Sequence, residues 1–187
     1  MSCISTESTQ FEKGSLMPRY AAFLRGVSPM NCKMPDLKKC LEEAGYSNVK
    51  TVLASGNVVF DAKATSETAL ERKLESILKK GLGREFPVYI RSVEALQGML
   101  AENPFSKYKL KSGTKCVVTF MRESPKTKPK LPIERDGARL LHISGKELFS
   151  AYVPSPKDPV FMQLIEKTLG KDVTTRAWDT IQKVARA

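Results

Sequence analysis

Arginine, glycine and small hydroxyl or amide residues occur together at two places in the first half of the chain and again near its end. Arg25-Gly26 ends one apolar stretch, Ser55-Gly56-Asn57 separates two others, and Arg176 follows a pair of threonines. Guanidinium groups pair with phosphate and carboxylate oxygens, and glycine lets the backbone approach a ligand closely. These residues indicate a site for a small anionic ligand that carries a phosphate or a carboxylate. The candidate residues are Arg25, Gly26, Ser55, Gly56, Asn57 and Arg176.

The predicted elements bring the first two groups to one edge of a sheet. A strand over 19–24 is followed by a helix from Pro35, and strands over 49–54 and 58–62 flank the Ser55-Gly56-Asn57 turn. A helical crossover makes the first two strands parallel. The end of the first strand, the start of the helix and the turn therefore lie at the same edge. The helix start adds unpaired N–H groups, because no Ser, Thr or Asn stands directly before Pro35.

A purely structural explanation fits the same residues. The glycines would then only permit turns, and Arg25 would pair with Asp36. Near the end of the chain, Thr174-Thr175 would cap a last helix that buries Trp178. Arg176 in the first turn of that helix is unfavourable beside the positive end of the helix dipole. We therefore expect Arg176 to have a partner elsewhere, either a carboxylate of the first half or an anionic ligand.

The order of elements between residues 17 and 104 predicts a ferredoxin-like, or split βαβ, unit. After the hairpin, apolar residues at helical spacing behind Thr65 or Ser66 predict a second helix. A strand over 86–91 and a helix that begins after Ser92 complete the order β-α-β-β-α-β. Few other topologies combine a hairpin with right-handed crossovers in this order.

The second half is predicted to be a smaller α+β subdomain. A strand over 115–121 precedes a proline-broken loop over 123–137, and a hairpin over 139–153 turns at Gly145-Lys146. A helix that buries Phe161 follows, and the last helix starts near Thr174-Thr175. The expected organisation is a disordered leader over 1–16, a ferredoxin-like α+β subdomain over 17–104, and a basic α+β subdomain with a C-terminal helix over 105–187.

The formal net charge of +11 is unevenly distributed along the chain. Residues 1–104 hold 14 basic and 12 acidic side chains, whereas residues 105–187 hold 17 and 8. Much of the surplus lies between Lys107 and Lys130, and a solvated surface or a mobile connection explains it most simply. The alternative is a nonspecific nucleic-acid-associated module, although the strands lack the aromatic signature of RNA-recognition motifs. The lysines of this alternative are Lys107, Lys109, Lys111, Lys126, Lys128 and Lys130.

Catalytic, metal and membrane functions find little support in the sequence. His142 is the only histidine, and no Asp, His or Cys stands at the spacing of a metal site or a triad, so we interpret it as a plain strand residue. The four cysteines form no C-x-x-C pair. No apolar run reaches the roughly 18 residues of a membrane span, and residues 1–16 lack the apolar core of a signal peptide. We expect a cytoplasmic protein with no cofactor, no metal and no recognisable catalytic constellation.

Four short motifs follow one another in a recognisable order from about residue 17 to the end. They are Leu24-Arg25-Gly26-Val27, Met34-Pro35-Asp36-Leu37, Ser55-Gly56-Asn57-Val58-Val59-Phe60 and Thr174-Thr175-Arg176-Ala177-Trp178. Together they resemble a mostly bacterial family called domain of unknown function 1697 (DUF1697). The resemblance implies a small cytoplasmic α+β protein of two subdomains, with no established activity. The chain departs from the family pattern at Val27-Ser28-Pro29-Met30, where Ile-Asn and glycines are usual, and at Ala177, where Asn is common.

Overall fold

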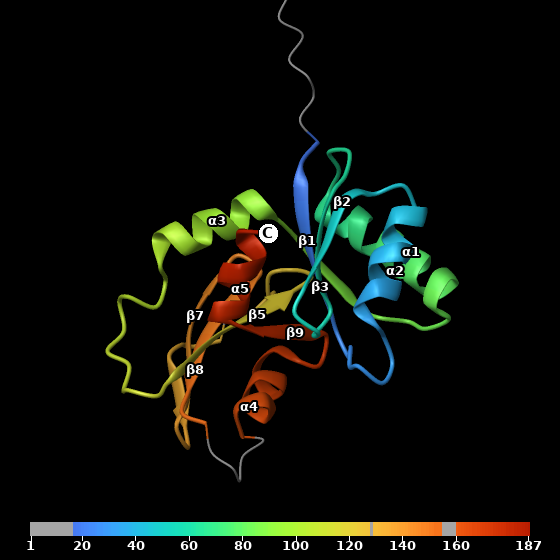
Figure 1. The fold of residues 1–187 in the computed structure, drawn as a ribbon. Coiled ribbons are helices and arrows are strands. Elements are labelled where there is room, and N and C mark those ends of the chain that lie inside the picture. The colour runs from blue at the N-terminus through green and yellow to red at the C-terminus, as the bar shows by residue number, and fades with distance from the viewer. Residues whose placement is uncertain (1–16, 128, 155–159) are drawn as a thin grey trace, which may run out of the picture.

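The protein is an α+β fold of two antiparallel sheets, as the sequence predicts (Figure 1). The computed structural model describes residues 17–127, 129–154 and 160–187. The leader predicted over 1–16 therefore lies outside the described residues, as does Lys128. Within the described residues, no helix is long and apolar enough to cross a membrane.

The first sheet has the strand order β2-β3-β1-β4, and all neighbouring strands are antiparallel. The elements of this half are β1 (Arg19–Leu24), α1 (Met34–Glu43), β2 (Ser47–Val52), β3 (Asn57–Asp61), α2 (Glu67–Leu82), β4 (Val88–Ser92) and α3 (Val93–Glu102). This is the split βαβ order predicted from the sequence. β2 begins two residues earlier than predicted, through a bulge at Asn48, whose φ of 50° is one that asparagine tolerates.

Helices α1 and α2 cover one face of the first sheet because their apolar residues recur at helical spacing (Figure 1). The hydroxyl of Ser66 accepts a hydrogen bond from the N–H of Ala69 and so fixes the start of α2. The helix residues buried against the sheet are Leu37, Cys40, Leu41, Leu70, Leu74 and Leu78. The sheet is therefore closed on this side, and any site must lie at its edges or on its other face.

The second sheet has the order β6-β7-β8-β5-β9, and two predictions in this half are wrong. Its elements are β5 (Lys115–Met121), β6 (Ile133–Arg135), β7 (Ala138–Ser144), β8 (Glu147–Tyr152), α4 (Val160–Leu169), β9 (Val173–Ala177) and α5 (Trp178–Ala185). The loop predicted over 123–137 contains β6, which pairs with β7. The last helix begins at Trp178 instead of Thr174-Thr175, because the β-branched residues there pair with β5 as an edge strand.

The two sheets share an apolar layer, which α3 and α5 complete. Along β1, Tyr20, Ala22 and Leu24 face α1 and α2, whereas Ala21 and Phe23 point to the other side, as the two-residue period of a strand requires. The ring of Phe23 stacks on that of Phe120 from β5, with 4.4 Å between the ring centres. Because Phe23 stacks on β5, and β5 pairs with β9, the end of β1 lies close to β9.

Candidate functional site

Arg176 lies on β9 and reaches across to the first sheet. Its Nε donates a hydrogen bond to Oδ1 of Asn57. Its Nη2 donates to the backbone oxygens of Leu24, at 2.6 Å, and of Ser55, at 3.1 Å. The guanidinium therefore joins β9 to the end of β1 and to the turn between β2 and β3.

The remaining guanidinium nitrogen of Arg176, Nη1, donates its hydrogen bonds within β9. Nη1 donates to Oγ1 of Thr174, at 3.0 Å, and to the backbone oxygen of Thr175, at 2.8 Å. The guanidinium carbon also lies 5.7 Å from the centre of the Phe23 ring. Burial lowers the pKa of Arg176 to about 10, so the group stays charged at neutral pH. All five N–H donors of this side chain thus have acceptors within the chain.

The position of Arg176 corrects the explanation that we derived from the sequence. The residue is in a strand and not in the first turn of a helix. Its partners do lie in the first half, but none of them is a carboxylate: backbone carbonyls and the amide oxygen of Asn57 accept its N–H groups. Neutral oxygens thus accept the N–H groups of this half-buried guanidinium, which forms no ion pair among the described residues.

The Ser55-Gly56-Asn57 turn is occupied by contacts within the chain. Nδ2 of Asn57 donates to the backbone oxygen of Val52, at 2.9 Å, and to Oγ of Ser55, at 3.0 Å. Gly56 has a φ of 73°, and a Cβ at this position would lie 2.7 Å from Cγ2 of Val27. The glycine is therefore required by its own conformation and by its close packing against the loop after β1.

We expect Gly56→Ala to lower the free energy of unfolding by about 2–3 kcal/mol, since it combines a left-handed backbone with overpacking. Gly26→Ala is the matched control, because Gly26 has a similar φ of 75° but nothing lies within 4 Å of its Cβ position. That variant should lose only the backbone part, about 1 kcal/mol. Urea unfolding of the two variants measures the difference, and equal losses would contradict the packing argument.

Arg25 follows β1, and its side chain forms one hydrogen bond within the described residues. Its backbone N–H donates to the carbonyl of Pro87, at 2.8 Å, and its Nη1 donates to the carbonyl of Lys171. Among the described residues it forms no ion pair, so the predicted partnership with Asp36 is not observed. The start of α1, at Lys33, has no side-chain cap, as expected.

A pocket of about 430 Å³ lies beside Arg25, between α4 and β9. Arg25 and Arg176 both line it, whereas Gly26 and the Ser55-Gly56-Asn57 turn do not. Tyr152 and Phe161, whose rings stack with 4.4 Å between their centres, contribute an apolar wall. Of the six predicted residues, Arg176 thus bonds directly to Ser55 and Asn57, and Arg25 and Arg176 line one pocket.

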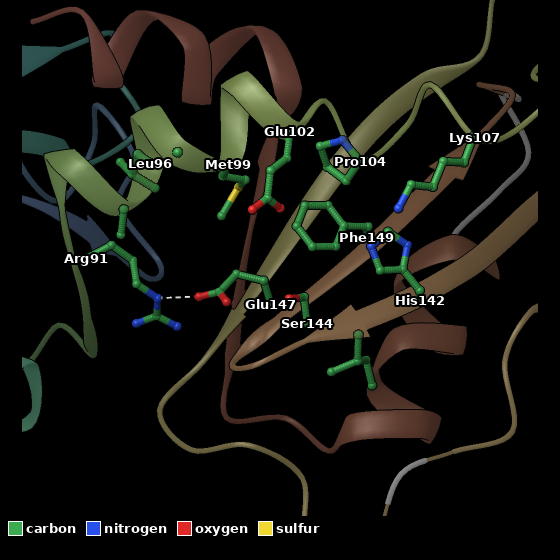
Figure 2. A pocket seen from close by; sticks show the side chains of 13 residues that line it. Arg91, Leu96, Met99, Glu102, Pro104, Lys107, His142, Ser144, Glu147 and Phe149 are labelled. Atoms are coloured by element: carbon green, nitrogen blue, oxygen red, sulfur yellow. Dashed lines mark hydrogen bonds and ion pairs between the residues drawn. The ribbon is translucent and has the colours of Figure 1, made fainter.

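A second pocket, of about 460 Å³, lies between α3 and the β7–β8 hairpin (Figure 2). Glu102, Lys107, His142 and Glu147 all line it. We interpreted His142 as a plain strand residue, and it does lie on β7, but it also forms part of this wall. No spacing in the sequence indicates the pocket, because α3 and the hairpin are brought together only by packing.

The comparison with family models shows to which family this chain belongs. A family model described as a protein of unknown function, DUF1697, matches residues 17–149. The chain belongs to the DUF1697 family. The resemblance carried by the four motifs is thereby confirmed for the residues matched. A comparison with curated proteins finds no match.

Among solved structures, the DUF1697 fold seen here is similar to that of the conserved bacterial protein SP0830 from Streptococcus pneumoniae. The two share 20% sequence identity with a TM-score of 0.67, and the alignment covers 91% of this chain and 98% of that one. At this identity the likeness shows the fold alone. The DUF1697 match itself ends within β8, so it includes Arg25 but not α4, β9 or Arg176.

The basic segment of this DUF1697 protein is divided between two connections. Lys107, Lys109 and Lys111 lie between α3 and β5, and Lys126 and Lys130 lie between β5 and β6. The backbone oxygen of Lys109 accepts a hydrogen bond from Nη1 of Arg139 at 3.4 Å, which ties the first connection to β7. Nucleic-acid binding by these lysines stays a prediction.

Proposed function

We propose that this DUF1697 protein binds a small ligand whose anionic group, a phosphate or a carboxylate, pairs with Arg25 in the α4–β9 pocket. The N–H donors of Arg25 that have no acceptor in the described part of the chain support this proposal most directly. Arg25 lines the pocket, and among the described residues only its Nη1 has an acceptor, the carbonyl of Lys171. Four N–H donors of the guanidinium are left to bind an oxyanion, with the fork geometry that such groups favour.

The other residues that line the pocket limit the class of ligand that fits it. Arg176 adds positive charge, although its donors are already used. Glu166 on α4 also lines the pocket, and no hydrogen bond or ion pair of its carboxylate is found among the described residues. A carboxylate repels a second anionic group. Together with the rings of Tyr152 and Phe161, this favours a ligand with one anionic group and an apolar body over a polyanion.

Methyl NMR of the methionines tests the proposal at the pocket itself. Met162 lines the α4–β9 pocket, and Met99 lines the pocket of Figure 2, so one spectrum of labelled methionine methyls reports on both. We expect phenyl phosphate to shift the Met162 signal and to leave Met99 in place. Arg25→Ala should weaken this binding at least tenfold, and Glu166→Gln should strengthen it. Arg84→Ala removes an exposed arginine elsewhere and is the matched control.

Two results would contradict the proposal. One is a Met162 shift that survives Arg25→Ala unchanged, since Arg25 would then not hold the anion. The other is the absence of a Met162 shift with phenyl phosphate, together with binding of single-stranded RNA or DNA that weakens steeply with salt and persists in Arg25→Ala. The second result would favour the basic connections that contain Lys107 and Lys126.

A further inference from the structure

The pocket of Figure 2 is separate from the α4–β9 pocket and has an apolar floor. Leu96 and Met99 from α3 and Phe149 from β8 line it, and Figure 2 shows the Phe149 ring between its two charged ends and the Met99 side chain next to Glu102. Leu96 and Phe149 are almost fully buried. Of the charged residues beside this floor, Glu147 is half-buried, whereas Glu102 and Lys107 are exposed. A charge at the mouth of such a pocket gains from a partner of opposite sign.

Two carboxylates define one end of this pocket. One oxygen of Glu147 accepts a hydrogen bond from Nε of Arg91, and no partner of its other oxygen is found among the described residues. Glu102, at the end of α3, also has no partner in that part of the chain, and Figure 2 shows its carboxylate directed towards Glu147. Arg91 neutralises only one of the two acids, so the space between them favours a cation.

The opposite end carries a positive charge and an imidazole. Figure 2 shows Lys107 beside His142, across Phe149 from Glu147. No hydrogen bond or ion pair of the Lys107 ammonium is found among the described residues. Nδ1 of His142 lies 3.0 Å from the hydroxyl of Tyr108, and the imidazole stacks on both Tyr108 and Phe149. Burial and the charge of Lys107 lower the pKa of His142, and Lys107 supplies a positive charge at this end.

We propose that this pocket binds a dipolar organic ligand, with an ammonium or guanidinium group between Glu102 and Glu147 and a carboxylate at Lys107. The separation of charge along one cavity, with an apolar floor between the ends, supports an amino-acid-like ligand with a short apolar spacer. Within the described residues, no three His, Cys, Asp or Glu side chains are grouped closely enough to hold a metal ion. The carboxylate pair is therefore matched to an organic cation, and the proposal does not depend on binding at Arg25.

A series of ω-amino acids tests the proposal through the Met99 methyl signal. The probes are glycine, 4-aminobutyrate and 6-aminohexanoate, with butylamine and butyrate as single-charge controls. We expect at least one of the longer amino acids to shift Met99 without moving Met162, and both single-charge compounds to bind at least tenfold more weakly. Glu102→Gln and Lys107→Gln should each weaken the amino acid about tenfold. Glu94→Gln on α3 and Lys109→Gln are the matched exposed controls.

The same titrations can overturn the proposal. If no probe shifts Met99, or if Glu102→Gln and Lys107→Gln bind the amino acid as tightly as the unaltered protein, the pocket does not recognise separated charges. Butylamine binding as tight as that of the best amino acid would likewise contradict a role for Lys107. A shift at Met162 alone would assign the probe to the α4–β9 pocket and would also count against this inference.

Discussion

Arg176→Met is expected to lower the free energy of unfolding by about 3–5 kcal/mol, because it leaves several acceptors of the protein without their donor. The backbone oxygens of Leu24 and Ser55 and the amide oxygen of Asn57 would be left without this donor. Losses of this size are a large part of the stability of a typical domain. Urea unfolding followed by fluorescence measures the effect, and the single tryptophan, Trp178, directly follows β9.

Arg176→Lys tests whether the positive charge alone or the hydrogen-bond geometry of the guanidinium stabilises the protein. Lysine keeps the positive charge but cannot direct five N–H groups to five acceptors, so we expect a loss that lies between those of Arg176→Met and the unaltered protein. If the main role of Arg176 were to attract a ligand, Arg176→Met would leave stability nearly unchanged and abolish the binding of phenyl phosphate. Full stability of Arg176→Met would therefore contradict the structural role that its hydrogen bonds indicate.

The element order of the first half could be predicted because each element buries one regular face. The spacing of Leu70, Leu74 and Leu78 is that of a helix with one apolar side, and the continuous apolar run of β1 is that of a strand buried on both faces. Turn residues such as Gly56 then limited the ways in which consecutive strands could be connected. Local pattern was sufficient here because the contacts that decide the structure repeat within one element.

The end of the chain could not be predicted in the same way. Threonine is favoured both at helix caps and in strands, so Thr174-Thr175 is compatible with either. The choice is made by β5, which supplies the ladder in which Thr119 lies opposite Thr175. The hydrogen bond between Arg176 and Asn57 likewise joins residues far apart in the sequence. A partner for Arg176 in the first half could be expected from its charge, but the identity of the acceptors could not.

The pocket of Figure 2 shows the same limit for a site. Glu102 and His142 lie on different elements, and each has an ordinary local environment in the sequence. Searching for metal-ligand or triad spacing detects residues that one element or one loop presents together. A pocket built from α3 and a hairpin has no such spacing, so His142 was assigned correctly to a strand while its place in a pocket was missed.

A second large effect is expected at Arg91, which is only 3% exposed. Its Nε donates to Glu147, and its Nη2 donates to the backbone oxygen of Met121 at 2.8 Å. Nη1 lies 3.6 Å from Glu67 and 4.0 Å from Glu71, both on α2. Arg91 therefore joins α2 to the β7–β8 hairpin of the second sheet.

Arg91→Met should destabilise the protein by about 3–5 kcal/mol, because it removes the counter-charge of Glu147 and one of the two arginines that face the buried Glu71. The expected loss exceeds that of Glu71→Gln, which keeps an oxygen to accept the N–H of Ile90. Adding Glu147→Leu to Arg91→Met should recover part of the loss, since an apolar pair removes the unmatched charge. Urea unfolding of the three proteins measures these differences, and failure of the double variant to recover stability would contradict the electrostatic explanation.

The pH dependence of the same variants gives an independent test. Burial raises the pKa of Glu71, although the N–H of Ile90 and the charges of Arg122, Arg91 and Lys146 act in the opposite direction. The folded protein thus holds this proton more tightly than the unfolded chain, and the contribution of Glu71 to stability falls as pH rises above the ordinary value for Glu. Removing the Arg91 charge raises the folded pKa further, so the decline should extend to higher pH in Arg91→Met and be absent when Glu71→Gln is added. Unfolding free energies over about pH 5 to 8 measure this, and identical slopes with and without Arg91 would show that Arg91 does not act on Glu71.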